Sequence, residues 1–166
     1  MDGKRLFDFN GYLKGLTEKN KMARRNGYAF TTCSGIENME GVLYNFQGHG
    51  RFVVADEVAS GEVWQNGGGW MHRRTITCFV VERSNAMDEP GRIAALARCR
   101  TLERQLLSRM LRDREAMTNE LVYMNLENIP YTELGTMALD GLTGLYFMVT
   151  IDEPTDISYN GDDWED

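Results

Sequence analysis

Residues 75–113 read TITCFVVERSNAMDEPGRIAALARCRTLERQLLSRMLRD, and this stretch decides the fold class. Residues 75–81 are rich in β-branched and aromatic side chains and end in a continuous apolar run, which predicts a strand buried on both faces. Pro90 then stands in the first turn of a helix that we expect to run to about residue 114. The apolar residues of this helix recur at spacings of three or four: Ile93, Leu96, Cys99, Leu102, Leu106 and Met110.

Before this stretch, the pattern predicts a first helix that runs to about residue 25, with Asp8 or Asn10 as its N-cap and Asn26-Gly27 as its stop. Residues 28–33 and 51–57 are predicted strands, with a short helix over residues 36–46 between them. Residues 62–64 and 74–82 predict a hairpin whose long, pliable tip is QNGGGWMHR (65–73). After the central helix, strands are expected over residues 121–126, 129–134 and 142–151, and Pro154 is expected to close the ordered fold.

These elements predict an α+β fold: a single domain in which a mainly antiparallel sheet packs with an N-terminal helix and a long central helix. The 166 residues match one domain, and shares of 42% hydrophobic and 26% charged residues argue against global disorder. We expect an assembly domain over residues 1–152 and an acidic C-terminal arm over residues 153–166. No apolar run approaches the ~20 residues of a membrane helix, and the N-terminal residues predict no cleaved secretion signal.

The cysteines predict buried free thiols. Cys33, Cys78 and Cys99 are odd in number, form no CxxC pair, and each lies in an apolar or periodic stretch. Such thiols are typical of a reducing compartment.

The net charge of −7 is concentrated at the C-terminus. The last fifteen residues hold seven acids and no Lys or Arg, so the other 18 acids balance the 18 Lys and Arg of the chain. This arm also carries Ile157, Tyr159 and Trp164. Two interpretations stay open: a solvated disordered tail, or an arm whose aromatics, Tyr159 and Trp164 above all, bind a pocket on a neighbour while its carboxylates meet basic residues.

The central helix is dense in arginine, with seven between Arg92 and Arg114. A solvated face with intrahelical pairs explains part of this density. In the alternative interpretation, the helix contacts an acidic surface of a neighbouring subunit. The partner-binding candidates are then Arg98, Arg104, Arg109 and Arg112. Direct nucleic-acid binding is a third interpretation, for which aromatic interleaving and a second basic segment are lacking.

The glycine run Gly67-Gly68-Gly69 lacks the Lys-Ser/Thr that follows a phosphate-binding loop. Its flanks hold two tryptophans and two arginines. The segment is either a plain flexible hairpin tip or a tip that docks on a partner. In the second interpretation the partner-binding residues are Trp64, Trp70, Arg73 and Arg74, because Trp and Arg are enriched at binding hot spots.

No pattern predicts a catalytic, metal or cofactor site. His49 and His72 are far apart, and neither has a carboxylate or Cys at ligand spacing. The adjacent acids Asp56 and Glu57 would point to opposite faces of a strand. Nucleophile elbow, zinc-protease and dinucleotide motifs are all missing from the sequence. We therefore expect a protein that is not an enzyme and binds no cofactor.

The order of elements, ending in the strand GLYFMVTIDEP (144–154), resembles that of the small tail-terminator and head–tail joining proteins of tailed phages. Residues 78–113 are also similar to uncharacterised proteins in prophages of gut Bacteroidetes. The resemblance covers about residues 5–152 and rests on layout, so no functional residue is carried over from it. It implies an antiparallel sheet beside helices and a ring of copies at the neck or tail end of a virion, assembled in the cytoplasm of a bacterial host.

Three functional classes remain open. The first is a structural ring protein whose partners are copies of itself and tail-tube or neck proteins. The second is a baseplate or adaptor module of a phage or contractile injection machine. The third is a small enzyme or nucleic-acid-binding protein, although neither has a supporting motif.

Overall fold

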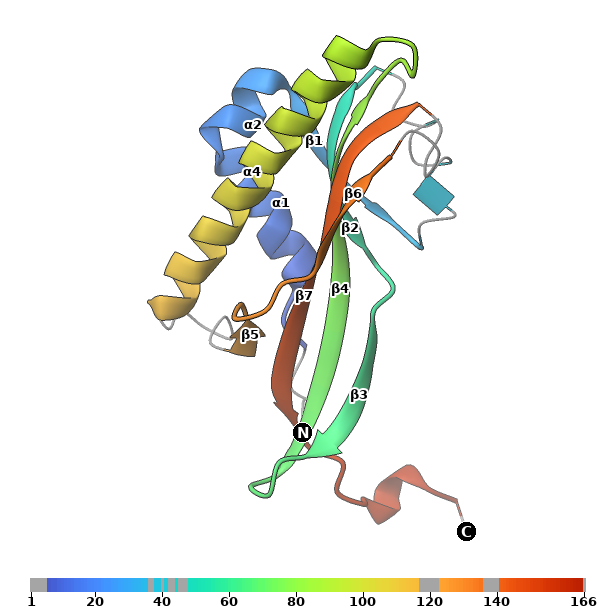
Figure 1. Ribbon diagram of the computed structural model, residues 1–166. Coiled ribbons are helices and arrows are strands. Elements are labelled where there is room, and N and C mark those ends of the chain that lie inside the picture. The colour runs from blue at the N-terminus through green and yellow to red at the C-terminus, as the bar shows by residue number, and fades with distance from the viewer. Residues whose placement is uncertain are drawn as a thin grey trace.

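A computed structural model describes residues 6–35, 38–39, 41, 44, 48–116, 123–135 and 141–165. Its helices and strands fall in two layers, a sheet and a helical layer against one face (Figure 1). In chain order they are α1 (Phe9–Lys19), α2 (Lys21–Asn26), β1 (Tyr28–Cys33), β2 (Arg51–Asp56), β3 (Ser60–Gln65), β4 (Trp70–Arg83), α4 (Glu89–Glu115), β5 (Met124–Asn125), β6 (Tyr131–Leu134), β7 (Leu142–Thr155) and the 3₁₀ turn η3 (Gly161–Asp163).

The sheet is built on β4 and β7, two strands of 14 residues that pair antiparallel along their whole length. In the described ranges the sheet has seven strands in the order β1-β2-β4-β7-β5, with β3 added to β4 and β6 added to β7. β1 pairs parallel with β2, and the other pairs are antiparallel. The predicted α+β class, a single domain with a mainly antiparallel sheet, is confirmed.

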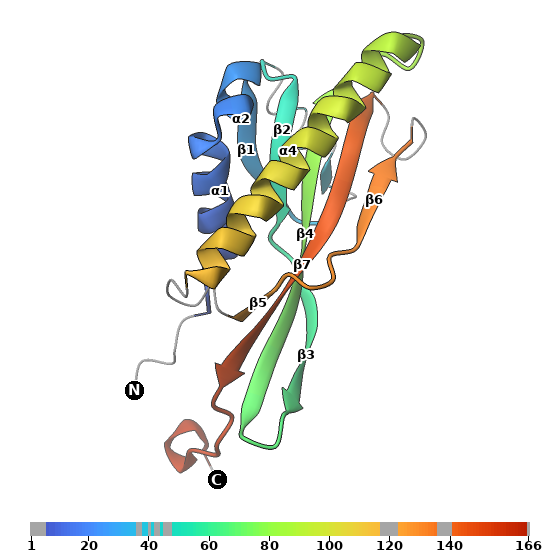
Figure 2. The ribbon, with the colours of Figure 1, turned by 60° about the vertical axis from the view of Figure 1, so that its left-hand side comes forward.

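Helices α1, α2 and α4 cover one face of the sheet (Figure 2). The buried side chains of α4 are Ala95, Cys99, Leu102, Leu106 and Met110, one stripe with helical spacing. A second cluster on the opposite face joins β2, β4, β6 and β7 with Met39. Residues 78–82 of β4 are buried between the two clusters, as the continuous apolar run predicts.

The N-terminal helix differs from the prediction, because two helices replace one. Asn20 has extended backbone (ψ 124°), and its side chain accepts a hydrogen bond from the Ala23 N–H, so it ends α1 and caps α2. The start of α1 and the end of α2 lie where the sequence predicts the ends of the single helix. Asp8 caps α1, and Gly27 ends α2 in the left-handed conformation at φ 68°. The short helix expected over residues 36–46 lies largely outside the described residues.

The predicted hairpin tip is shorter than expected. β3 ends at Gln65 and β4 begins at Trp70, so only residues 66–69 form the turn, with Gly67 at φ 83°. Residues 70–73 were expected in the loop, but they lie between β3 and β7 and pair with both. Backbone hydrogen bonds on two sides stabilise a strand there in spite of its loop-like composition.

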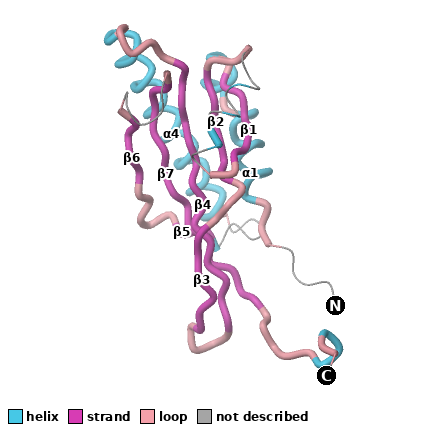
Figure 3. The backbone as a smooth tube through the Cα atoms, turned by 90° about the vertical axis from the view of Figure 1, so that its right-hand side faces the viewer, coloured by secondary structure: helices cyan, strands magenta, loops and turns pink. Residues whose placement is uncertain are grey.

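The lower ends of β3, β4 and β7 extend beyond the helical layer (Figure 3). We call residues 60–74 with residues 152–155 the strand extension. β7 reaches Thr155 and so passes the predicted boundary at residues 152–153, and Pro154 lies inside the strand. Among the described residues, β5 pairs with β7 only at Thr150 and Ile151, so no described strand pairs with Pro154 along that edge.

Candidate partner-binding surfaces

A groove of about 820 Å³ lies between α1–α2 and α4. Its floor includes the buried side chains Leu16 and Leu106. Six cationic residues line it and no acidic residue does: Lys19, Lys21, Arg25, Arg104, Arg109 and Arg112. We call this surface the basic groove. Three of the four candidate arginines of the central helix therefore share one surface with cations from α1 and α2. No sequence pattern had indicated a role for these α1 and α2 cations.

The charges of the basic groove are largely unpaired. Arg109 forms a salt bridge of 2.7 Å with Asp113, one turn further along α4. The carboxylate of Asp113 also accepts a hydrogen bond of 2.9 Å from the Tyr12 hydroxyl. Among the described residues, the other five cations form no salt bridge. All six side chains belong to exposed residues, so the groove presents positive charge to solvent.

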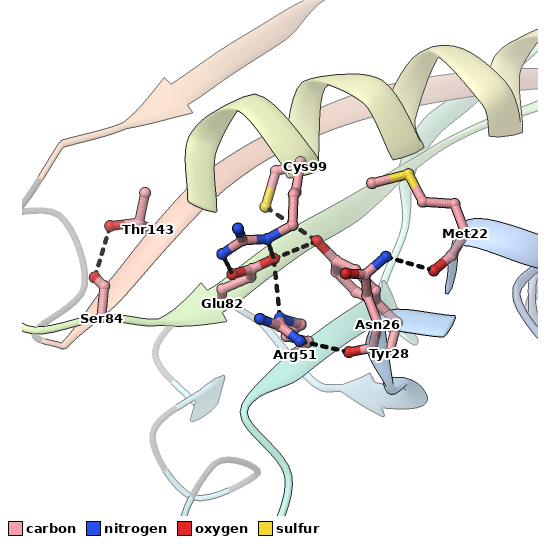
Figure 4. Close-up of polar contacts among 9 residues, drawn as sticks. Met22, Asn26, Tyr28, Arg51, Glu82, Ser84, Cys99 and Thr143 are labelled. Atoms are coloured by element: carbon pink, nitrogen blue, oxygen red, sulfur yellow. Dashed lines mark hydrogen bonds and ion pairs between the residues drawn. The ribbon is translucent and has the colours of Figure 1, made fainter. Parts of the chain in front are cut away.

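Arg98, the fourth candidate on α4, faces the sheet instead. Its partner is Glu82 of β4, which belongs to a polar cluster with Tyr28 and Arg51 (Figure 4). Arg98 donates from Nε to Oε1 at 2.9 Å and from Nη2 to Oε2 at 2.8 Å, a bidentate pair. The Tyr28 hydroxyl donates to Oε1 at 2.6 Å, and Arg51 Nε lies 3.3 Å from the same oxygen.

This Glu82 cluster shifts the pKa of its members. Burial raises the pKa of Glu82, but the hydrogen bonds from Arg98 and Tyr28 and the two guanidinium charges outweigh it, so the pKa falls below its ordinary value. Burial also raises the pKa of Tyr28, and it raises that of Cys99 to about 12. The thiol and phenol therefore stay protonated at neutral pH. Glu82 is only 3% exposed, and its oxygens are occupied by partners within the chain, which suits a structural anchor.

A smaller hollow of about 360 Å³ lies beside the Glu82 cluster, at the start of α4. Asp88 lines it, and its carboxylate already caps the helix through the Gly91 N–H at 3.1 Å. The polar groups of this hollow thus serve the fold.

Three of the four partner-binding residues predicted around the hairpin are held by contacts within the chain. Trp64 donates its indole N–H to Asp152 at 2.9 Å, and its ring lies 4.8 Å from the Arg73 guanidinium. Arg73 bonds Asp152 at 2.8 Å and Glu62 at 2.7 Å. On the opposite face, Arg74 bonds Glu153 at 3.0 Å and the Phe7 carbonyl at 2.9 Å.

Trp70 is the fourth of these residues and remains 40% exposed at the end of the strand extension. The C-terminal arm presents further aromatic surface. Tyr159 and Trp164 stack with their ring centroids 6.5 Å apart and remain 74% and 67% exposed. The 3₁₀ turn η3, capped by Asn160, lies between them. Trp70, Tyr159 and Trp164 are therefore the predicted aromatic anchors that the fold leaves accessible.

The cysteines and histidines form no chemical site in the described part of the chain. Cys33, Cys78 and Cys99 are buried and form no disulfide with one another, as predicted. His49 packs its ring 6.5 Å from that of Phe52, and His72 lies in β4. No group of three or more His, Cys, Asp or Glu side chains in the described ranges is placed to hold a metal ion. Across those same ranges, no helix combines the length and apolar character needed to cross a bilayer.

No protein-family model matches this chain, and no curated protein matches it in sequence. The basic groove, the strand extension and the acidic arm are therefore the features from which its function is inferred.

Proposed function

We propose that this chain is a structural protein of a tailed-phage particle, where copies of it form a ring at the head–tail neck or at the tail end. The strand extension is the observation that carries the proposal. β4 and β7 continue past the helical layer as a ribbon with β3, and this ribbon projects from the two-layer body (Figures 1 and 3). A single domain gains no core from such a projection, whereas a subunit of an assembly can contact a neighbour or a tube with it.

The edges of the sheet support side-by-side association. Among the described strands, β3 pairs only with β4, β6 only with β7, and β1 only with β2. Outer strands with unpaired backbone groups are templates for a strand of another chain. The same chain also presents two surfaces of opposite charge, the basic groove and the acidic arm. Two different complementary surfaces on each subunit are what a head-to-tail ring requires.

A second candidate is a baseplate or adaptor module of a phage or a contractile injection machine. The exposed Trp70 at the end of the extension favours it, because one aromatic anchor on a projecting tip suits the recognition of a single partner. In both candidates the protein is located in the virion or machine and contacts tail-tube, neck or baseplate proteins.

The proposal is tested by deleting the gene in frame from the genome that encodes it and imaging the particles by electron microscopy. A neck protein predicts filled heads and tails that fail to join, and a tail-end protein predicts tails of irregular length. A plasmid copy should restore normal particles. Normal, infectious particles without the chain would contradict the proposal. A reconstruction of the restored particle should show a ring of this fold, whereas single copies at a baseplate would favour the second candidate.

A further inference from the structure

The acidic arm has charge that its own fold does not use. Of the seven acids in the last fifteen residues, Asp152 and Glu153 form salt bridges with Arg73 and Arg74 inside the strand extension. Five acids follow them in sequence: Asp156, Asp162, Asp163, Glu165 and Asp166. The structure describes four of them, Asp156, Asp162, Asp163 and Glu165, and these four form no salt bridge with another described residue.

The basic groove has the opposite imbalance. Six cations line it, one of them is paired with Asp113, and no acid belongs to its lining. The apolar floor of Leu16, Met22 and Leu106 offers a surface for aromatic rings. Arginine side chains also stack on Tyr and Trp faces, so the groove suits a peptide that is both acidic and aromatic.

The arm of one chain lies away from the groove of that chain. It leaves the end of β7 that is farthest from α2, and both views place the C-terminus at the opposite end of the molecule from α2 (Figures 1 and 2). No hydrogen bond or salt bridge joins arm and groove among the residues described. A contact between them is therefore best made from one copy to another.

We propose that the acidic arm of one copy docks in the basic groove of a second copy. The carboxylates of residues 156–166 pair with the cations that α1, α2 and α4 leave open, and Tyr159 and Trp164 pack over the apolar floor. The contact is head-to-tail, since arm and groove are different surfaces, and it can repeat from copy to copy. This inference rests on the proposed function, because both require that copies of the chain associate. It adds which two surfaces meet.

A binding experiment with the full chain tests the contact directly. The receptor is the chain carrying Asp162→Asn, Asp163→Asn and Glu165→Gln, so that its own arm competes weakly. The probe is a fluorescein-labelled synthetic peptide of residues 155–166, followed by anisotropy. We expect saturable binding that weakens as salt rises, because added ions screen exposed charge pairs.

Charge reversal in the groove provides the matched comparison. Arg104→Glu with Arg112→Glu should weaken peptide binding at least about tenfold. Lys14→Glu with Arg24→Glu makes the same change of charge on the same helical layer outside the groove lining, and should leave the affinity within about twofold. All four side chains belong to exposed residues, so the fold should persist, and circular dichroism checks this. Absent binding, or equal binding by both variants, would overturn the proposal.

Nucleic acid is the competing occupant of a basic groove. A labelled 20-base DNA strand is therefore titrated against the same receptor and variants. Tight DNA binding that the groove variant abolishes, together with no peptide binding, would replace the arm with nucleic acid as the ligand.

Mixing two variants tests the exchange between copies. A groove-reversed chain keeps its arm, and an arm-neutralised chain keeps its groove, so each alone lacks one half of the contact. We expect monomers of each alone and a heterodimer on mixing, measured by sedimentation velocity. Two unchanged monomers would overturn the inference. The deletion experiment on particles is independent of these outcomes, so failure of the ring and failure of the arm contact are distinguishable.

Discussion

At the residue scale, Glu82 joins the two layers of the molecule. It lies at the end of β4, and its partners come from three other elements: Tyr28 of β1, Arg51 of β2 and Arg98 of α4. Because the carboxylate is 3% exposed, its charge is stabilised by these partners instead of water. Removing the charge would leave two like-charged guanidinium groups close together, with side chains 37% and 32% exposed, and no carboxylate between them.

The first prediction concerns the substitution Glu82→Gln. We expect it to lower the free energy of unfolding by about 2–4 kcal/mol, since breaking a buried pair leaves an uncompensated charge. Glu133→Gln is the control, because Arg100 holds Glu133 in the same bidentate geometry with donors 2.6 and 2.8 Å away, but at an exposed site. The control should change stability far less. Equal losses in urea unfolding of the two variants would show that burial of Glu82 contributes nothing.

The second prediction concerns pH. The pKa of Glu82 is lowered in the folded protein, so its contribution to stability is complete above the ordinary Glu pKa of about 4.3 and is lost as pH falls through the folded value. The amide that replaces this carboxylate in Glu82→Gln does not titrate. The stability difference between wild type and Glu82→Gln should therefore be largest near pH 7 and shrink below about pH 4. Urea unfolding of both proteins at pH 7 and at a pH below 4 measures this difference in stability. A difference that does not change with pH would contradict the lowered pKa of Glu82.

Sequence patterns could not identify this cluster. Glu82 directly follows an apolar run that predicts a buried strand. A carboxylate at the end of such a strand was the one sequence feature that indicated a buried ion pair. Arg98 lies sixteen residues further on and was assigned to a partner-facing surface, since spacing does not show which helical arginine turns inward. The pairing of β1, β2 and β4, which places Tyr28 and Arg51 beside Glu82, is a long-range register that local patterns do not encode.

At the element scale, the helices and strands with strong local signals were predicted best. β1 has the predicted bounds, and α4 differs from its predicted bounds by about one residue at each end. β4 was predicted too short, because Trp70 to Arg73 follow three glycines and owe their strand conformation to β3 and β7. The basic groove was also predicted only in part. The arginines of α4 were identified from the sequence, but the packing of α1 and α2 against α4 is what brings Lys19, Lys21 and Arg25 beside them.

The third prediction concerns α1, which contains two glycines. An ideal Cβ at Gly15 meets nothing within 4 Å, so Gly15→Ala should stabilise the protein by about 0.5–1 kcal/mol through helix propensity. Gly11 is the matched control in the same helix. Its Cβ would lie 2.3 Å from an oxygen of the capping Asp8, so Gly11→Ala disturbs the cap and should give no such gain. Thermal unfolding of both variants measures this, and equal gains would show that the Asp8 cap is dispensable.

At the scale of the whole molecule, the chain consists of a well-packed body and two projecting parts, the strand extension and the acidic arm. In β4 the residues from Ile76 to Glu82 are mostly buried, whereas those from Trp70 to Thr75 are exposed or half-buried. The sequence predicted the fold class and the charge of the arm. It did not predict the extension, since a strand that projects past its core has no apolar alternation to reveal it.

The fourth prediction follows from that division. Backbone hydrogen bonds at residues 70–74 and 152–155 should open at lower free energy than those at residues 76–81 and 145–151, because fewer apolar side chains are buried around them. Hydrogen exchange followed by mass spectrometry should show faster exchange, by at least about tenfold, in peptides from the extension. In assembled particles the same peptides should become protected, since the ring proposal places the extension against a neighbour or a tube. Protection of the extension that is already complete in the monomer would mean that its stability needs no partner, and would remove the main structural support for the ring.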